Sequence, residues 1–333
     1  MFVPEPDLSL ASTPTPTERL DSLSETHDAD LYVKRDDMTG GIVQGNKVRK
    51  LEYLLADALD RGADTVITTG GVQSNHCRAT AVTARKVGLE PYLLLRGDEP
   101  EVYDGNLLLD RIAGAEIEYV SPEEYYDDPE GMFERATDRL EDRGRAPYVI
   151  PSGGSNGLGL LGYVRAYEEI VTDARAHGVS FDSIYSAAGS AGTYAGLLAG
   201  ALLAEDDETE IVGVNVTSAT SEELAEKVLD NLADCEELIE EYTFDLDEAA
   251  DRISFLDGYT GPGYAIPAEA DLATIKEAGH EEGLVLDTCY TGKAFRGFLE
   301  NVESGETALF VHTGGSYGLF PKREELTELL AED

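Results

Sequence analysis

The feature that most constrains the fold is an alternation of short apolar segments with amphipathic helices along most of the chain. Each apolar segment is short and rich in aliphatic or β-branched residues, and a stretch with helical periodicity follows it. A chain that returns to one sheet through a helix places its strands parallel. We expect strands at 63–70, 90–97, 115–121, 146–154 (with its turn), 181–189, 210–217 and 306–315, and helices at 48–59, 74–88, 106–114, 132–144, 162–178, 193–205 and 222–241.

The length of the chain predicts two domains. A chain of 333 residues exceeds what one hydrophobic core usually supports. The sequence contains no flexible linker and no internal repeat, so two α/β domains that face a cleft are expected. Ligands of such sheets bind at the carboxyl ends of the strands.

The charge of the chain is strongly acidic, with a formal net value of −42. This charge excludes a nucleic-acid-binding protein, which needs clustered Lys and Arg. The acidic residues are spread over most expected helices and do not form a tail, and such self-repulsion destabilises a compact state unless salt screens it. We interpret the acidity as adaptation to a salt-rich, halophilic cytoplasm. An acidic interaction protein in ordinary salt is the alternative.

Cysteine and histidine usage gives no disulfide framework and no metal site. The three cysteines form no CxxC pair, and the five histidines lack metal-ligand spacing. No apolar run approaches the ~20 residues of a membrane helix, and the first residues do not resemble a signal peptide. We therefore expect a cytoplasmic protein without a metal and without membrane contact.

Three expected strands end in glycine-rich turns that could bind anions. GGVQSNH (70–76) offers Ser74, Asn75 and the start of a helix, and AAGSAGTYAG (187–196) offers backbone N–H groups with two hydroxyls. HTGGSYG (312–318) follows the last expected strand. Each turn also has a purely structural interpretation: a helix cap, close helix–strand packing, or a plain turn.

Two of the eight lysines, Lys47 and Lys50, lie in the expected first turn of a helix. The helix dipole disfavours cations there by roughly 0.3–1 kcal/mol. The i, i+3 spacing places both side chains on one face, where mutual repulsion and burial lower their pKa values. A lysine of lowered pKa can form a Schiff base with a carbonyl cofactor, and its neighbour can pair with a phosphate. A solvated basic patch is the alternative interpretation.

Together these segments resemble the fold-type II pyridoxal-phosphate (PLP) enzymes, in the branch that contains D-cysteine desulfhydrase and 1-aminocyclopropane-1-carboxylate (ACC) deaminase. The resemblance covers most of the chain. It implies that residues 1–49 and 156–333 form a large PLP-binding domain and 50–155 a small domain, each a twisted, mostly parallel sheet, with the site between them. A homodimer is also implied. The motifs are KRDDMTG (34–40), GNKVRKLEYL (45–54), GGVQSNH (70–76), GSAGTYAGL (189–197), GPGYAIP (261–267), YTGKAF (290–295) and HTGG (312–315).

The resemblance also implies a role for individual residues. Lys47 would hold PLP in a Schiff base and then remove the α-proton of the substrate. Lys50 would contact the phosphate, and Asn75 the 3′-oxygen of the ring. Ser74 would hold the substrate carboxylate, and His76 is either an acid for the leaving group or an ordinary residue at a helix start. The phosphate loop would be Gly189, Ser190, Ala191, Gly192 and Thr193, and the substrate pocket would include Tyr264 and Tyr290.

The expected substrate depends on Thr291 and Thr313. ACC deaminases resemble this chain but have Glu and, typically, Leu at these positions. A carboxylate keeps the pyridine nitrogen protonated and the cofactor strongly electron-withdrawing, whereas a threonine hydroxyl leaves a weaker electron sink. The weaker sink suffices for β-elimination of a good leaving group, so we expect a lyase of the D-cysteine desulfhydrase type that makes pyruvate, sulfide and ammonia.

Other functions remain open from the sequence. Within the same branch, the chain could be similar to an L-cysteate sulfo-lyase or be an ACC deaminase despite the two threonines. A non-catalytic α/β protein that binds a phosphorylated ligand is a second class, and it would need no reactive lysine. The acidic interaction protein is a third class, which the lysine pair and the absence of a charged tail disfavour.

Overall fold

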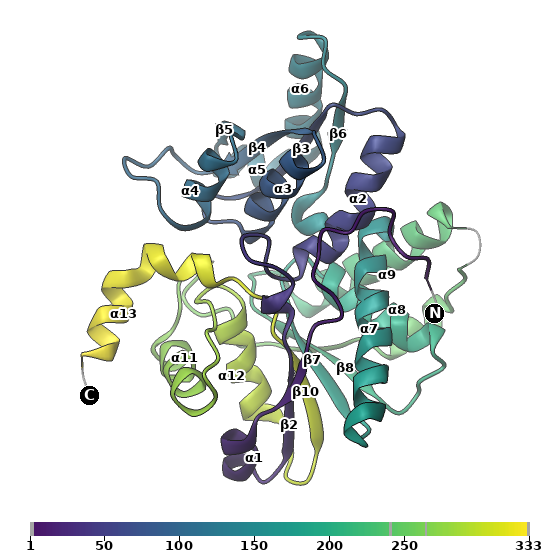
Figure 1. Ribbon diagram of the computed structural model, residues 1–333, viewed down its shortest axis with the longest axis vertical. Helices are drawn as coiled ribbons and strands as arrows, with labels where there is room; N and C mark the ends of the chain where they lie inside the picture. The colour runs from purple at the N-terminus through teal and green to yellow at the C-terminus, as the bar shows by residue number, and fades with distance from the viewer. Residues whose placement is uncertain (1–2, 240–241, 264, 332–333) are drawn as a thin grey trace.

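The computed structural model describes residues 3–239, 242–263 and 265–331, which form two sheets with helices packed on them (Figure 1). The larger sheet has the strand order β1-β2-β10-β7-β8-β9, and the smaller has β5-β4-β3-β6. Neighbouring strands are parallel except for β1 and β2, which are antiparallel. The expected α/β fold with mostly parallel sheets is confirmed.

The strands of the larger sheet are β1 (Thr17–Arg19), β2 (Asp30–Lys34), β7 (Ser183–Ala188), β8 (Glu210–Asn215), β9 (Ser254–Leu256) and β10 (Thr307–Val311). The strands of the smaller sheet are β3 (Thr65–Gly71), β4 (Glu90–Arg96), β5 (Glu116–Val120) and β6 (Pro147–Val149). The smaller sheet therefore comes from one continuous segment, whereas the larger combines the two ends of the chain.

The helices that follow the first strands are α1 (Asp21–His27), α2 (Lys47–Asp60), α3 (Asn75–Lys86), α4 (Gly105–Ile112), α5 (Pro122–Asp127) and α6 (Pro129–Glu141). Those of the second half are α7 (Gly157–His177), α8 (Gly192–Leu203), α9 (Ser221–Leu238), α10 (Leu246–Asp251), α11 (Glu269–Glu282), α12 (Thr291–Asn301) and α13 (Arg323–Leu330). Three short 3₁₀ turns are η1 (Asp36–Met38), η2 (Ser152–Gly154) and η3 (Ser316–Lys322).

Each element expected from the sequence is present, with shifted ends. The α7 helix starts at Gly157, five residues before the expected start, because the Asn156 side chain accepts a hydrogen bond from Gly159 N and caps it. The expected strand at 146–154 is shorter and ends at Val149. The elements that the sequence analysis did not predict are β1, β2, β9, α1, α5 and α10–α13. Most of these are short or carry weak periodicity.

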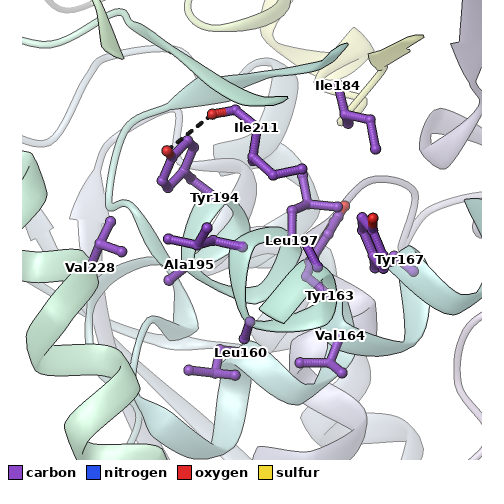
Figure 2. Packing of buried hydrophobic residues seen from close by; sticks show 14 of the residues in the cluster. Leu160, Tyr163, Val164, Tyr167, Ile184, Tyr194, Ala195, Leu197, Ile211 and Val228 are labelled. Carbon is purple, nitrogen blue, oxygen red and sulfur yellow. Dashed lines mark hydrogen bonds between the residues drawn. The ribbon is translucent and has the colours of Figure 1, made fainter. Parts of the chain in front are cut away.

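The core of the larger domain forms where α7 and α8 pack on the sheet (Figure 2). Tyr163 and Tyr167 of α7 lie beside Leu197 of α8, and all three side chains are buried. The Tyr194 hydroxyl donates to Ile211 O of β8 over 3.1 Å, so its polar end is satisfied inside the core. This core holds the β7–α8 turn in place.

The start of α2 is held by a close helix contact and a buried ion network. A Cβ atom on Gly162 of α7 would lie 2.6 Å from Arg49 C, so only glycine allows α2 to approach this closely. The Arg49 guanidinium donates to the buried Asp36 carboxylate over 2.8 and 2.9 Å and also to Glu169. Arg49 follows Lys47 by two positions in the same helical turn, so this network positions the lysine.

A buried carboxyl group in the smaller domain leads to a stability prediction. Asp110 of α4 is fully buried, neither carboxyl oxygen has a hydrogen-bond partner within the described part of the chain, and burial raises its pKa to about 8. Because folding raises the pKa of this carboxyl, its burial costs no stability below the pKa of near 4 that it has in the unfolded chain. The free energy of unfolding then decreases as the pH rises towards 8. We expect Asp110→Asn to be more stable than wild type at pH 8, by roughly 2–5 kcal/mol, and nearly equal at pH 4.

Guanidinium unfolding at the two pH values measures this difference. Glu141→Gln removes an exposed acid from the same domain, and it controls for the general relief of repulsion in so acidic a chain. An Asp110→Asn protein that is less stable than wild type at pH 8 would show that the carboxylate is satisfied by a partner such as water.

Candidate active site

A cavity of about 760 Å³ lies between the two domains and is lined by residues of both. The turns after β3, β6, β7, β8 and β10, together with the last residue of β4, contribute to its wall, as expected for the carboxyl ends of parallel strands. The structure brings together ten of the residues predicted from the sequence: Lys47, Ser74, Asn75, His76, Gly189, Ser190, Ala191, Thr193, Tyr290 and Thr313.

Lys47 is the first residue of α2, and its half-buried side chain faces this cavity. Burial lowers the pKa of its amine to about 8. A substantial fraction of the amine is therefore unprotonated near neutral pH, which is the form that attacks a carbonyl. The sequence-based prediction of a lysine with a lowered pKa at a helix start agrees with this geometry.

The segments GNK (45–47) and HTGG (312–315) lie in contact beside Lys47. Gly45 has a φ of +106°, and a Cβ atom there would lie 2.6 Å from Thr313 O, so glycine is required on both counts. Asn46 N donates to the same carbonyl over 3.2 Å. The GNK and HTGG motifs are thus joined backbone to backbone, and this contact places Thr313 on the wall near Lys47.

Lys50 is buried behind the cavity wall and is absent from the lining. Its ammonium donates to Gly153 O and Ser155 Oγ, both over 3.3 Å. Burial and the charge of Lys47 hold its pKa well below the ordinary value. Lys50 therefore supports the turn that lines the cavity, and a direct contact with a ligand phosphate stays a prediction.

The β7–α8 turn forms an anion cradle. Ala191 has a φ of +62° just before α8 begins, so the turn folds back and exposes the backbone of the helix start to the cavity. The Ser190 hydroxyl is 2.8 Å from Ser155 Oγ, and Thr193 Oγ1 accepts from Asn46 Nδ2 over 2.8 Å. Two serine hydroxyls and the N-terminus of a twelve-residue helix thus meet in one place.

The β3–α3 turn forms a second polar wall. The Ser74 hydroxyl accepts from Cys77 N over 3.2 Å, so Ser74 caps α3, as the structural interpretation of this turn predicted. Asn75 Oδ1 accepts from Asn106 Nδ2 over 2.9 Å, which orients the amide of Asn75. Both residues also line the cavity, so capping and ligand binding are compatible here.

His76 is buried and uncharged. Its Nε2 lies 2.8 Å from Thr68 Oγ1, which itself donates to Ile150 O, so Nε2 carries the proton and Nδ1 does not. Burial and the charges of Lys47 and Lys50 hold its pKa well below the ordinary value. A neutral imidazole with no proton to give at Nδ1 favours the structural interpretation of His76.

Thr291 and Thr313 occupy different environments. Thr313 lines the cavity beside Gly314, and the ring of Tyr290 packs against Gly189 of the β7–α8 turn. Thr291 is fully buried, does not line the cavity, and donates its hydroxyl to Asp287 Oδ1 over 2.8 Å. The hydroxyl also accepts from Asp287 N, and because its one proton is directed to Asp287 it cannot donate to a ring nitrogen. Of these two threonines, we therefore retain only Thr313 as a candidate contact with the cofactor.

The last predicted residue, Tyr264, lies outside the described residues. Other lining residues were missed by the sequence analysis, among them residues of PSGGS (151–155), of α5, of the end of β4, of the segment after β8 and of α9. The PSGGS segment carries the same signal as the other turns, since glycines and serines follow a strand. Arg96 and Tyr125 carry no local signal, because their contact with the cavity depends on how the domains pack.

Comparison with known proteins agrees with this geometry. A family described as "Pyridoxal-phosphate dependent enzyme" matches residues 8–314, which is most of the chain. This chain belongs to that family. The pyridoxal-phosphate enzyme described here is 47% identical over 321 residues to a putative 1-aminocyclopropane-1-carboxylate deaminase of Thermotoga maritima, covering 96% of this chain and 99% of the relative.

Two further relatives are similarly close. A D-cysteine desulfhydrase of Serratia proteamaculans is 41% identical and covers 95% of each chain. A crystal structure titled as that of an ACC deaminase homologue is 40% identical, has a TM-score of 0.88, and covers 97% of this chain and 96% of that one. The enzyme thus shares its whole fold with relatives that carry two different substrate names.

The residues of the cavity fit pyridoxal phosphate. Lys47 supplies an amine with a lowered pKa, and the β7–α8 turn supplies N–H groups and hydroxyls suited to a phosphate. Asn75 and Thr313 line the cavity and would offer neutral polar groups to the ring, and the turn at Ser74 would receive a carboxylate. PLP supplies an electron sink that stabilises negative charge at the α-carbon of an amino acid.

Proposed function

We propose that this enzyme is a lyase that catalyses β-elimination on a small amino acid, with D-cysteine as the substrate that the site supports best. The observation that carries the proposal is the polarity of the wall near Lys47. Thr313 lines this wall, whereas Asp287, whose carboxylate accepts from the Thr291 hydroxyl, is buried and does not line the cavity. The cavity-lining carboxylates among the described residues, Asp230 and Asp234, both come from α9.

A neutral hydroxyl favours elimination over ring opening. A hydroxyl cannot hold a proton on a pyridine nitrogen as a carboxylate does, so the electron sink is weaker. β-Elimination tolerates a weaker sink because a good leaving group departs as the α-proton is lost. ACC has no such proton on its α-carbon, and its unactivated ring is harder to open.

The roles of the chain's own residues follow from their positions. The turn at Ser74 binds and orients the substrate carboxylate. Lys47 Nζ receives the α-proton as general base, and its pKa of about 8 suits proton transfer near neutral pH. Tyr290, half-buried in the cavity wall beside Gly189, is the side chain that assists the departing thiol.

The test is 2-oxo acid release by the protein purified with PLP in high salt. D-cysteine, L-cysteine, L-cysteate and ACC are offered separately. Pyruvate with sulfide from D-cysteine is the expected result. Formation of 2-oxobutyrate from ACC would overturn the argument from Thr313 and would support deaminase activity, which the name of the Thermotoga relative suggests.

We also propose that the enzyme works as a homodimer in a salt-rich cytoplasm. Exposed apolar side chains such as Val102 and Ile112, each 72% exposed, are suited to a subunit contact. The charge of −42 requires screening by salt. Light scattering in molar potassium chloride should give twice the mass of 35.9 kDa, and the monomer mass at all concentrations would exclude the dimer.

A further inference from the structure

One cation of the cavity wall has no role in the proposed reaction. Arg96 is the last residue of β4, and its half-buried side chain lines the cavity. In the parallel ladder its Cα is paired with that of Gly71, the last residue of β3. Adjacent strands lie about 4.8 Å apart, so Arg96 begins one strand spacing from the turn at Ser74.

The order of the strands determines what lies on each side of that turn. In the sheet order β5-β4-β3-β6, Arg96 follows β4 on one flank of β3, whereas the Ser152–Ser155 turn follows β6 on the other flank. The Ser155 hydroxyl contacts Ser190 of the anion cradle. A ligand carboxylate at Ser74 thus lies between the cradle on one side and Arg96 on the other.

Aromatic residues of α5 hold the Arg96 side chain. Its guanidinium lies 4.8 Å from the ring centroid of Tyr125 and 4.9 Å from that of Tyr126, and it donates to the Tyr126 hydroxyl. Cation–π contacts restrict the guanidinium, so less entropy is lost when it binds a ligand. The planar N–H fork matches the geometry of a carboxylate or a sulfonate.

The charge of the cavity differs from that of the protein. Acidic residues outnumber basic ones 67 to 25 in the whole chain. The described lining instead contains the cations Arg96 and Lys227, the amine of Lys47 and two carboxylates, and one of these, Asp234, accepts from Gly157 N over 2.6 Å. A cation on the wall of a partly enclosed site attracts an anion that the outer surface repels.

We propose that Arg96 is a specificity residue that binds a second anionic group, carried on the side chain of the amino-acid substrate. The class of ligand is an α-amino acid with a side-chain carboxylate or sulfonate. This inference rests on the proposed function only in taking the turn at Ser74 as the site of the α-carboxylate. It extends the substrate range beyond neutral amino acids of the size of cysteine.

The test compares two isosteric ligands, aspartate and asparagine, each as the D and the L form, on the PLP-loaded enzyme. Titration calorimetry in constant molar salt measures their dissociation constants, and neither ligand has to be turned over. We expect wild type to bind aspartate of the preferred form roughly 10- to 100-fold more tightly than asparagine, as for one charge-assisted hydrogen-bonded pair. Equal affinities would overturn the proposal without any variant.

Variants assign the preference to Arg96. Arg96→Gln should remove the preference for aspartate and leave asparagine binding within about 3-fold, and Arg96→Lys should restore part of it. Arg143→Gln removes one exposed positive charge from the same domain and should leave the preference unchanged. Equal weakening of both ligands in Arg96→Gln would mean that Arg96 only supports α5, and would overturn the proposal.

The two proposals can fail separately. The enzyme could prefer aspartate through Arg96 and yet release no pyruvate from any cysteine-type substrate. This result would overturn the proposed elimination and support the anion site. Pyruvate release from D-cysteine together with equal binding of aspartate and asparagine would support the proposed elimination and overturn the anion site. The wild-type measurement needs no mutation, so the folding of a variant does not affect this distinction.

Discussion

Lys47→Ala should abolish turnover, with a fall of ~10³-fold or more, because the substitution removes both the amine that binds the cofactor and the general base. Trapping provides a readout that is independent of activity. Borohydride reduction of the wild-type enzyme with PLP should leave a cofactor mass on the peptide that contains Lys47, and the variant should show none. Pyruvate release by Lys47→Ala at the normal rate would contradict the assignment.

The lowered pKa of Lys47 also predicts how cofactor capture depends on pH. The free amine reacts, and its fraction rises as the pH passes the pKa of about 8. The rate at which apoprotein captures PLP should therefore increase between pH 7 and 9. Lys86→Ala removes an exposed lysine of α3 and is the matched control, with unchanged capture and turnover. A rate that does not change with pH would mean that the amine is already unprotonated at pH 7.

Asp36→Ala should destabilise the protein by roughly 3–5 kcal/mol, because it removes one partner of a buried ion pair. Asp36 is fully buried and accepts from Arg49, Thr15 Oγ1 and the Tyr163 hydroxyl. Burial alone would raise the pKa of this carboxyl, but Arg49 and these donors hold it below the ordinary value. The substitution would leave Arg49 with Glu169 as its remaining carboxylate.

Chemical unfolding in high salt measures the change in free energy. Asp21→Ala also removes a carboxylate that is paired with an arginine, Arg19, but Asp21 is 83% exposed, and its loss should cost less than about 1 kcal/mol. Asp36→Ala should also reduce activity in the protein that remains folded, since Arg49 positions the first turn of α2. Equal stability of the two variants would show that the buried network contributes nothing beyond a surface pair.

The different positions of Asp36 and Lys47 explain why KRDD and GNKVRK stand out in the sequence. Lys34 and Asp36 of the first motif, and Arg49 of the second, belong to the buried network, whereas Lys47 faces the cavity. The first motif thus serves to fix the backbone, and the second combines this role with a lysine that faces the cavity. Six of the eight lysines are buried or half-buried, as expected for a chain whose surface is acidic: Lys34, Lys47, Lys50, Lys276, Lys293 and Lys322.

The sequence by itself determined the fold class and the cofactor chemistry. Alternating strands and helices require parallel sheets, and a lysine pair at a helix start among glycine-rich turns indicates a carbonyl cofactor with a phosphate, because these signals are local and depend on spacing alone. The resemblance to a known family added the roles of individual residues, and ten of the residues named in this way line one cavity.

Only the tertiary structure decided which of those residues face the ligand. Thr291 and Thr313 look equivalent in the sequence, yet one hydroxyl is turned to Asp287 and the other side chain lines the cavity. Lys50 lies behind the wall, and Arg96, which has no motif, lies in it. The direction of a side chain depends on contacts with residues far along the chain, such as Gly162 against Arg49 and Thr313 against Gly45, and no local pattern records those contacts.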